Sequence, residues 1–371
     1  MKSKYRRIVV KAGTSVLTGG GEKLDLDNMT SLVAQIAQLH DRNIELILVS
    51  SGAIAAGRHV LGLPEGRRDI SFRQVLAAIG QSHLMRTYDE LFSRHAIKVA
   101  QALLTRNDFG NRQDYLNVRN TLMALLELKV LPVVNENDVV AMEEIGEVFG
   151  DNDRLSALVA NLVDADLLVI LTDTGGLYTD DPHVNPEAQL VRHVNRVDSK
   201  VEALAVRHYK STSRGGMSTK LEAAKLATAS GVTMVICNGA EPDVLARLIA
   251  GEELGTLFSP IADKMESRKR WMLSGLSTYG EIVIDQGAVA ALKEGKRSLL
   301  PAGVKEVRGR FHRGDIVYIV ECGGSRLACG IVNYSASDSD KIRGSRSDQI
   351  YRILGYHYGQ EIVHRNNMVL L

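Results

Sequence analysis

Residues 7–18 read RIVVKAGTSVLT, and the apolar run Ile8–Val10 in this stretch is followed at once by lysine, alanine, glycine and two hydroxyl residues. A run of this length and β-branched content predicts a strand rather than a buried helix. Four further runs of the same kind follow along the chain: Ile44–Val49, Val130–Val134, Leu167–Leu171 and Val232–Cys237. The first strand therefore begins a repeated pattern.

Segments with helical periodicity separate these strands. They are Asp27–His40, Phe72–Phe92, Tyr115–Leu128, Arg154–Val163 and Thr219–Ser230. Apolar strands that alternate with amphipathic helices form mostly parallel sheets with helices on both faces. The pattern thus predicts an α/β fold, a three-layer α/β/α sandwich around a mostly parallel sheet.

All five predicted strands end in small or polar residues. Their exits read KAGTS after Val10, SSGA after Val49, NEND after Val134, TDTGG after Leu171 and NGAEP after Cys237. Turn formation explains any one of these exits by itself. Ligands of open α/β sheets bind beyond the carboxyl ends of the strands, so the five exits together predict one binding site at that edge.

Two glycine-containing segments predict contact with phosphate. Lys11 precedes Gly13, and residues Arg214–Lys220 read RGGMSTK in front of a predicted helix. Small residues let backbone N–H groups approach an anion, and a helix N-terminus favours negative charge. An ordinary strand-to-helix turn also explains the first segment, and a flexible loop with Ser218 as N-cap also explains the second. Neither segment matches the P-loop pattern.

Polar clusters supply further candidates. Asn135–Asp138 reads NEND and Gly150–Asp153 reads GDND. Asx turns account for either cluster, with Asp153 as an N-cap of the helix that follows, whereas in a ligand site carboxylates among amides suit an ammonium group, lysines or a metal. Ser51 either caps a helix or binds a carboxylate. The exit Thr172–Asp173 suits a turn or a nucleotide.

The pattern changes near residue 260. Residues 261–278 have no clear periodicity, and we interpret them as a connection. Beyond them come short strand-like runs with glycine-rich turns, namely Glu281–Ile284, Asp315–Val320 and Leu327–Val332. We therefore predict a first domain over residues 1–260 and a separate small β-rich domain over residues 279–371.

The composition of the 371 residues, with 45% hydrophobic and 24% charged side chains and a formal net charge of +1, is that of an ordinary folded protein. It argues against disorder and against nucleic-acid binding through net charge alone. No apolar run reaches the roughly 18 residues of a membrane span or, near the N-terminus, the about 7–15 of a signal peptide. Three cysteines suit a reducing compartment, and we interpret Cys322 and Cys329 as buried small apolar side chains. The sequence predicts a cytoplasmic protein without membrane contact.

Six motifs occur in order along the chain: VVKAGTSVLT, LVSSGAIAAGR, LPVVNENDVV, FGDND, LLTDTGGLYTDDP and GGMSTKLEAA. Together they resemble the amino acid kinase family, and within it the branch that phosphorylates glutamate. The segment LKEGKRSLLPAGVKEVRGRFHRGDIVYI is similar to the opening of a PUA domain, so the β-rich tail is expected to be a small PUA-like barrel. The resemblance covers nearly the whole chain.

The resemblance implies transfer of the γ-phosphoryl group of ATP, with Mg²⁺, to the γ-carboxylate of L-glutamate. The product would be L-glutamyl 5-phosphate, in the first step of proline biosynthesis. Lys11 and Lys220 would flank the transferred group as catalytic residues, and Asp153 would orient their ammonium groups. Arg214 departs from the small residue that is usual at its place in the family.

The same resemblance implies the binding residues. Those for glutamate are Ser51, Gly52, Asn135, Asp138 and Asn152. Those for the nucleotide are Lys11, Gly13, Thr172, Asp173, Arg214, Gly215, Gly216, Met217, Ser218, Thr219 and Lys220. No residue is implied as a metal ligand.

Two alternatives stay open. A PUA-like tail suggests RNA binding, although 13 Lys and Arg against 10 Asp and Glu from residue 279 onward give it a net charge of only +3. Within the kinase class, N-acetylglutamate or aspartate is the alternative substrate. The resemblance further implies feedback inhibition by L-proline, a homo-oligomer (tetramer or dimer) and a glutamyl-phosphate reductase as metabolic partner.

Overall fold

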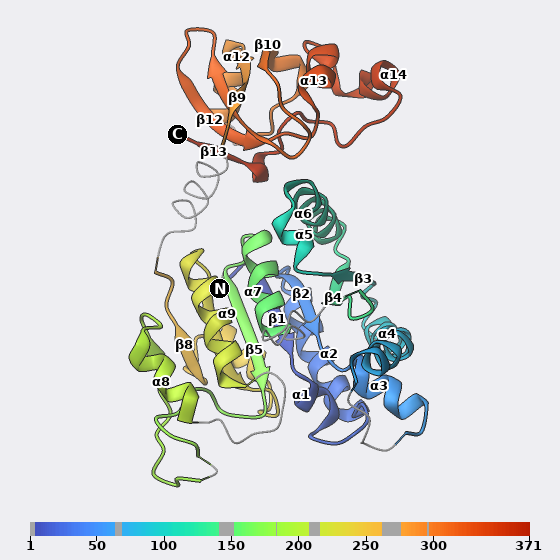
Figure 1. Cartoon of the computed structure of the whole chain (residues 1–371), viewed down its shortest axis with the longest axis vertical. Helices are drawn as coiled ribbons and strands as arrows, with labels where there is room; N and C mark the ends of the chain where they lie inside the picture. Colours follow the sequence, from blue (N-terminus) through green and yellow to red (C-terminus); the bar gives the residue numbers. More distant parts are fainter. Residues whose placement is uncertain are drawn as a thin grey trace. The chain divides into compact units, whose positions relative to one another are not determined.

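The computed structural model describes residues 4–63, 69–140, 152–182, 184–207, 216–261, 276–294 and 297–371. Contacts between Cα atoms divide the chain into two compact units (Figure 1). Unit 1 comprises Met1–Phe109 and Val118–Asp263, and unit 2 comprises Gly110–Asn117 and Lys264–Leu371. All five strand exits identified in the sequence belong to unit 1.

Unit 1 contains an eight-stranded sheet with the strand order β3-β4-β2-β1-β5-β7-β8-β6. The strands are β1 (Arg7–Ala12), β2 (Glu45–Ser50), β3 (Val99–Leu104), β4 (Leu131–Glu136), β5 (Leu167–Thr172), β6 (His193–Val194), β7 (Thr233–Asn238) and β8 (Thr256–Phe258). Every pairing is parallel except that of β7 with β8. The predicted mostly parallel sheet is confirmed, and the five predicted strands are its neighbours β4-β2-β1-β5-β7.

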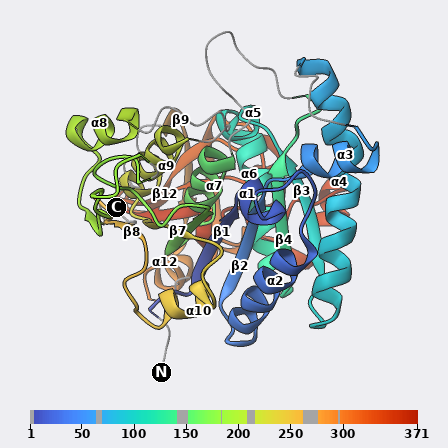
Figure 2. The same cartoon turned by 90° about the horizontal axis from the view of Figure 1, so that it is seen from below.

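Helices cover both faces of this sheet (Figures 1 and 2). On one face, Ile8 and Val10 of β1 belong to a buried cluster with residues of α2 (Leu26–Asp41) and α4 (Ile70–Ser93). Successive strand residues point to opposite faces, so Val9, which has no exposed surface, points to the other one. There α7 (Asn152–Leu162) contacts β1 and β5, and α9 (Met217–Ala229) contacts β7. The three-layer α/β/α sandwich is confirmed.

Two glycines let α3 (Ala53–Val60) and α4 touch through their backbones. A Cβ added to Gly57 would lie 1.9 Å from the carbonyl oxygen of Leu76, and one added to Gly80 would lie 1.8 Å from that of Ala53. Both distances are far inside van der Waals contact, so each position requires glycine. The other helices described before residue 262 are α1 (Thr14–Thr18), α5 (Asn107–Gly110), α6 (Arg112–Glu127), α8 (Ser199–Arg207) and α10 (Val244–Ile249).

Unit 2 contains a five-stranded sheet with the order β10-β9-β11-β12-β13. Its strands are β9 (Leu276–Ile284), β10 (Val304–Gly309), β11 (Ile316–Glu321), β12 (Arg326–Ile331) and β13 (Met368–Leu370). Its helices are α12 (Gln286–Lys293), α13 (Ala336–Ile342) and α14 (Ile350–Leu354), with 3₁₀ turns at Pro301–Gly303, Ser347–Gln349 and Arg365–Asn367. A buried apolar cluster that includes Ile282, Phe311 and Tyr334 forms its core. The small β-rich domain expected from the sequence is confirmed.

One sequence interpretation is wrong. Cys329 is buried as expected, but Cys322 is exposed, because it follows the last residue of β11 in the turn to β12. The predicted connection falls mostly on residues 262–275, which lie outside the described residues. In the part of the chain that is described, no helix is both long and apolar enough to cross a membrane.

Candidate active site

The carboxyl ends of the five central strands lie at one edge of the first sheet. Because β4, β2, β1, β5 and β7 run parallel, their exits face the same way. Backbone hydrogen bonds continue the pairing just past the strand ends. The Ser51 N–H donates to the Ala12 oxygen over 3.1 Å, and the Gly239 N–H donates to the Thr172 oxygen over 2.8 Å. The predicted alignment of the exits is confirmed.

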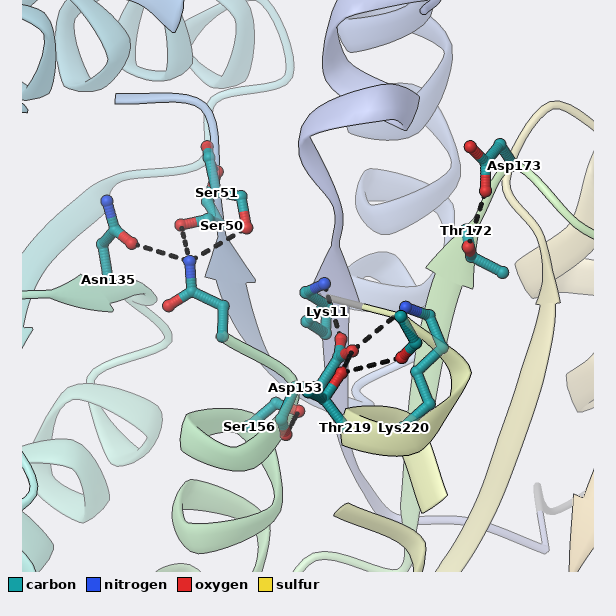
Figure 3. A network of polar contacts seen from close by, with 12 residues as sticks. Lys11, Ser50, Ser51, Asn135, Asp153, Ser156, Thr172, Asp173, Thr219 and Lys220 are labelled. Atoms are coloured by element: carbon teal, nitrogen blue, oxygen red, sulfur yellow. Dashed lines mark hydrogen bonds and ion pairs between the residues drawn. The ribbon is translucent and has the colours of Figure 1, made fainter. Parts of the chain in front are cut away.

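Asp153 lies between two lysines at the centre of this edge (Figure 3). Lys11 Nζ, from β1, is 2.6 Å from Asp153 Oδ1, and Lys220 Nζ, from the first turn of α9, is 3.1 Å from Asp153 Oδ2. Asp153 has no exposed surface, and Lys11 and Lys220 are 5% and 7% exposed. The structure therefore brings together the three residues predicted as catalytic. Asp153 lies within α7 rather than at its N-cap position, and its carboxylate forms these two ion pairs.

The electrostatics of this centre favour an anion. Burial alone would raise the pKa of Asp153, but attraction by Lys11 and Lys220 outweighs it and lowers the pKa to about 2. The carboxylate is therefore charged at neutral pH. Two ammonium groups around one carboxylate leave an excess positive charge, and in water-poor surroundings such a charge acts strongly on a phosphoryl group.

Helix α9 begins at the same centre. Its N-cap is Gly216, with φ −63° and ψ 179°, and the first N–H groups of a helix have no acceptor within it. Thr219 Oγ1 lies 2.8 Å from the Gly216 oxygen and 3.2 Å from Asp153 Oδ2, so its single proton is shared between two acceptors. Ser218, considered as N-cap from the sequence, lies within the helix beside Met217. Arg214 and Gly215 lie outside the described residues.

The exits of β1 and β5 adjoin the lysine centre. Gly13 is the N-cap of α1, and a Cβ added there would lie 3.5 Å from Lys11 Nζ, so glycine keeps space open beside that ammonium group. The buried Thr172 donates through Oγ1 to Oδ1 of the exposed Asp173 over 3.0 Å. Figure 3 shows this pair at the end of β5, beside the strand that carries Lys11.

A group of amides and hydroxyls lies on the other side of β1. Asn152 begins α7, and its Nδ2 donates to Ser51 Oγ over 2.9 Å, to Asn135 Oδ1 over 3.0 Å and to the Ser50 oxygen over 3.3 Å. Asn135 and Ser51 come from the neighbouring exits of β4 and β2 (Figure 3). The structure thus brings together Ser51, Asn135 and Asn152, which the sequence predicted as binding residues.

Two other predicted residues lie near this group. Gly52, with φ +99°, is the N-cap of α3, and an added Cβ would lie 3.3 Å from both Leu17 Cδ1 and Leu24 Cδ2. The alternative that Ser51 caps this helix is therefore wrong. Asp138 lies half-buried in the turn after β4. Burial raises the pKa of Asp138, although the charge of Arg73 opposes this effect.

Three residues of the group were not predicted from the sequence: Ser50, Gln81 and Tyr88. Ser50 Oγ donates to the Ser51 oxygen and lies 2.8 Å from the Tyr88 hydroxyl, while Gln81 Oε1 accepts from Asn135 Nδ2 over 2.7 Å. Burial raises the pKa of Tyr88, so its hydroxyl stays protonated. Gln81 and Tyr88 are seven residues apart, which places both on the buried face of α4. Polar groups on an otherwise apolar helix face were the sequence signal that could have identified these two residues.

The donor set fits phosphate better than a bare metal ion. In the described ranges, no cluster of three or more His, Cys, Asp or Glu side chains is placed to hold a metal. Both oxygens of Asp153 already face ammonium groups. The two lysines, the Gly13 turn and the first turn of α9 instead present positive charge and N–H groups, which are the donors that phosphate oxygens accept from.

Comparison with known proteins gives matches over the whole chain. The profile of the amino acid kinase family matches residues 6–238, and that of the PUA domain matches residues 280–354. A glutamate 5-kinase of Dehalococcoides mccartyi strain CBDB1 is 52% identical over 99% of both chains. The protein of the same name from strain ATCC BAA-2266 / KCTC 15142 / 195 is 54% identical, also over 99% of both. That of Herpetosiphon aurantiacus is 51% identical over 98% of both.

Proposed function

The chain belongs to the amino acid kinase family, and from this premise we propose that it transfers the γ-phosphoryl group of ATP to the γ-carboxylate of L-glutamate. The products are ADP and L-glutamyl 5-phosphate, the first intermediate of proline biosynthesis. The observation that carries the proposal is the buried centre Lys11–Asp153–Lys220, with amides on one side and the β5 exit on the other. Glutamate 5-kinases that are 51% to 54% identical over nearly their whole length support the choice of substrate.

The chemistry requires charge neutralisation more than a base. The γ-carboxylate of glutamate is ionised at neutral pH and attacks the γ-phosphorus directly. An oxygen–phosphorus bond forms, the bond from the γ-phosphorus to the bridging oxygen breaks, and ADP leaves with that oxygen. Lys11 and Lys220 offset the negative charge on the transferred group, and Asp153 holds both ammonium groups in place.

The amide side of the centre is the proposed glutamate site. Ser51, Asn135 and Asn152 supply hydrogen-bonding groups there, and Asp138 supplies a carboxylate for the α-ammonium group. Gly52 contributes its position at the N-terminus of α3, where its φ of +99° favours glycine and an added Cβ would be in tight contact with Leu17 and Leu24.

The other side is the proposed nucleotide site. It comprises Gly13, Thr172, Asp173 and the segment Arg214–Lys220, of which Gly216, Met217, Ser218 and Thr219 open α9. Mg²⁺ belongs to the proposal as a partner of the ATP phosphates, since the described carboxylates do not cluster around a metal position. When bound, it would add positive charge to the phosphate oxygens.

The resemblance of the sequence motifs adds further features to the proposal. They are feedback inhibition by L-proline at the glutamate side, assembly into a dimer or tetramer, and a glutamyl-phosphate reductase that consumes the product. The cytoplasm is the proposed compartment, since the odd number of three cysteines suits a reducing one.

The decisive experiment measures ADP release from ATP and Mg²⁺ with L-glutamate, N-acetylglutamate or L-aspartate in parallel. Hydroxylamine converts an acyl phosphate into a hydroxamate, which is read by its colour with iron(III). We expect ADP and hydroxamate only with L-glutamate, and less of both when L-proline is added. Turnover of another acceptor instead would show that the chain is a kinase of the same family with a different substrate. Folded protein without turnover of any acceptor would refute the proposal and direct the search to RNA binding by unit 2.

A further inference from the structure

Gln81 is a buried residue of α4 that takes no direct part in the proposed reaction. Its side chain is 9% exposed, and its Oε1 accepts a hydrogen bond from Asn135 Nδ2 over 2.7 Å. Leu84 and Tyr88, on the same face of α4, belong to the apolar core beneath the sheet. A buried glutamine on such a face is unfavourable unless it is hydrogen-bonded, and Asn135 supplies a hydrogen-bond partner. The presence of this polar pair in the core therefore requires an explanation.

A backbone group fixes which end of the Asn135 amide faces Gln81. The N–H of Glu136 donates to Asn135 Oδ1 over 2.9 Å, and a backbone N–H can only donate. The oxygen of the Asn135 amide therefore faces this N–H, and its Nδ2 faces Gln81. Gln81 in turn must present Oε1, because Nε2 would place a donor against a donor.

A second backbone group fixes Asn152 in the same way. The carbonyl oxygen of Ser50 can only accept, and it lies 3.3 Å from Asn152 Nδ2. Asn135 Oδ1, already fixed as an acceptor, lies 3.0 Å from the same nitrogen. Gln81, Asn135 and Asn152 thus form a directed chain of amides in which each orientation agrees with the next.

This amide chain ends in an acceptor. Among the described residues, Asn152 Oδ1 is buried without a hydrogen-bond partner, and so is Gln81 Nε2 at the opposite end. Buried polar atoms without partners are rare in native proteins and commonly mark a position completed by a ligand or water. An unpaired carbonyl oxygen suits a donor, and the α-ammonium group of an amino acid is a donor with positive charge.

We infer that Gln81 is a positioning residue of the substrate site. Together with the Glu136 N–H and the Ser50 carbonyl, and through Asn135, it holds the Asn152 amide in the orientation that presents Oδ1 to the ammonium group of the substrate. This inference rests on the proposed function, since it assumes that an amino acid binds beside Asn152. In the opposite orientation, Asn152 Nδ2 would meet the ammonium group donor to donor, and selectivity for an amino acid would fall.

The test replaces Gln81 by methionine, which keeps length and approximate volume but removes both hydrogen-bonding atoms. We expect the KM for L-glutamate to rise about tenfold, as for the loss of one charge-assisted hydrogen bond, with kcat within about threefold of wild type. The KM for ATP should not change. Glutarate lacks the ammonium group, so its kcat/KM should stay unchanged and the preference for glutamate over glutarate should fall about tenfold.

A double-mutant cycle shows whether Gln81 acts through Asn135. In the Asn135→Ala background, Gln81→Met should raise the glutamate KM by less than about twofold, because the contact is already lost. Ser82→Ala changes an exposed neighbour on the same helix and should leave every parameter at its wild-type value. Gln81→Leu provides the same measurement if circular dichroism finds the methionine variant unfolded.

Three results would overturn the inference: an unchanged glutamate KM in a folded Gln81 variant, equal losses with glutarate, or fully additive effects in the double variant. A purely structural role would produce the last two. Wild-type protein without glutamate-dependent turnover would instead refute the proposed function itself, so the two failures are distinguishable.

Discussion

Asp153 is a carboxylate with no exposed surface, held by the ammonium groups of two lysines from different elements. Burying a charge is unfavourable, and the close opposite charges of Lys11 and Lys220 offset this cost. Removal of the carboxylate would leave two ammonium groups in a buried space. The residue therefore links the stability of unit 1 to the geometry of its active site.

We predict that Asp153→Asn lowers the free energy of unfolding by about 3–5 kcal/mol at pH 7, as for a broken buried ion pair. The folded-state pKa of Asp153, about 2, lies below its ordinary value of 3.8. Its contribution is therefore complete above about pH 4 and is lost as the pH falls through about 2. Urea unfolding across this pH range should show that the difference in the free energy of unfolding between wild type and variant narrows by about 2 kcal/mol.

The control for this prediction is Asp173→Asn, which removes an exposed carboxylate of the neighbouring exit. It should change the free energy of unfolding by less than about 0.5 kcal/mol. A difference in the free energy of unfolding between wild type and Asp153→Asn that stays constant from pH 4 to pH 2 would contradict the assigned ion pairs.

We predict that Lys220→Ala lowers kcat by about a hundredfold or more, because it removes a charge that acts on the transferred phosphoryl group. Steady-state ADP release measures this. Lys225→Ala removes a lysine from the same helix that pairs with Glu202 at the surface, and it should leave kcat within about twofold. Near-normal turnover of Lys220→Ala would exclude this lysine from the mechanism.

The sequence identified much of the site at the residue scale, but not its supports. Lys11, Asp153 and Lys220 lie in motifs that could be recognised. Gln81 could not be assigned a role, because its contact with Asn135 joins positions 54 residues apart, and Tyr88 likewise reaches Ser50 only in the folded sheet. No local pattern encodes such contacts.

At the scale of elements, the backbone contact of α3 with α4 sets the position of the second strand exit. Gly57 and Gly80 allow the two helices to approach until their backbones are in contact. Gly52, at the N-terminus of α3, follows Ser51 directly, and α4 carries Gln81 and Tyr88. Both helices therefore hold the amide side of the site.

We predict that Gly80→Ala destabilises the protein by about 1–3 kcal/mol, because the new methyl group would force the helices apart. The same displacement should raise the glutamate KM more than the ATP KM, since only the amide side moves. Thermal unfolding and steady-state kinetics measure the two effects. Gly110→Ala is the matched control, since an added Cβ there meets nothing within 4 Å. Equal changes in both KM values would contradict a local effect.

The elements that the sequence predicted are those with strong local patterns. Among the described elements, the five central strands of the first sheet and the five helices of eleven or more residues were predicted. Strand β3 was missed because it has partly exposed alanine and glutamine positions at the edge of the sheet, and β10 because most of its positions are exposed. Strands β6, β8 and β13 were missed because two or three residues carry no periodicity. Their pairing is determined by neighbouring strands rather than by their own residues.

At the scale of the whole molecule, every described residue of the proposed site belongs to unit 1. We predict that a chain without Tyr279–Leu371 retains measurable kinase activity. Its melting temperature should fall, because Gly110–Asn117 belongs to unit 2 by its contacts and would lose them. Hydroxamate formation and thermal unfolding of the truncated chain measure both effects. A folded but inactive truncation would show that the tail completes the site.

Strand β1 separates the sheet into two groups of strands, with β2 and β4 on one side and β5 and β7 on the other. The proposed acceptor contacts come from the first group and from the start of α7. The proposed nucleotide contacts come from the β5 exit, from Gly13 after β1 and from the start of α9, and the charged centre lies between the two sets. For protein engineering, this means that a library aimed at a new acceptor can be confined to the first group. Such variants would inherit the phosphoryl-transfer centre intact, so acceptor choice and catalytic chemistry can diverge independently in the same scaffold.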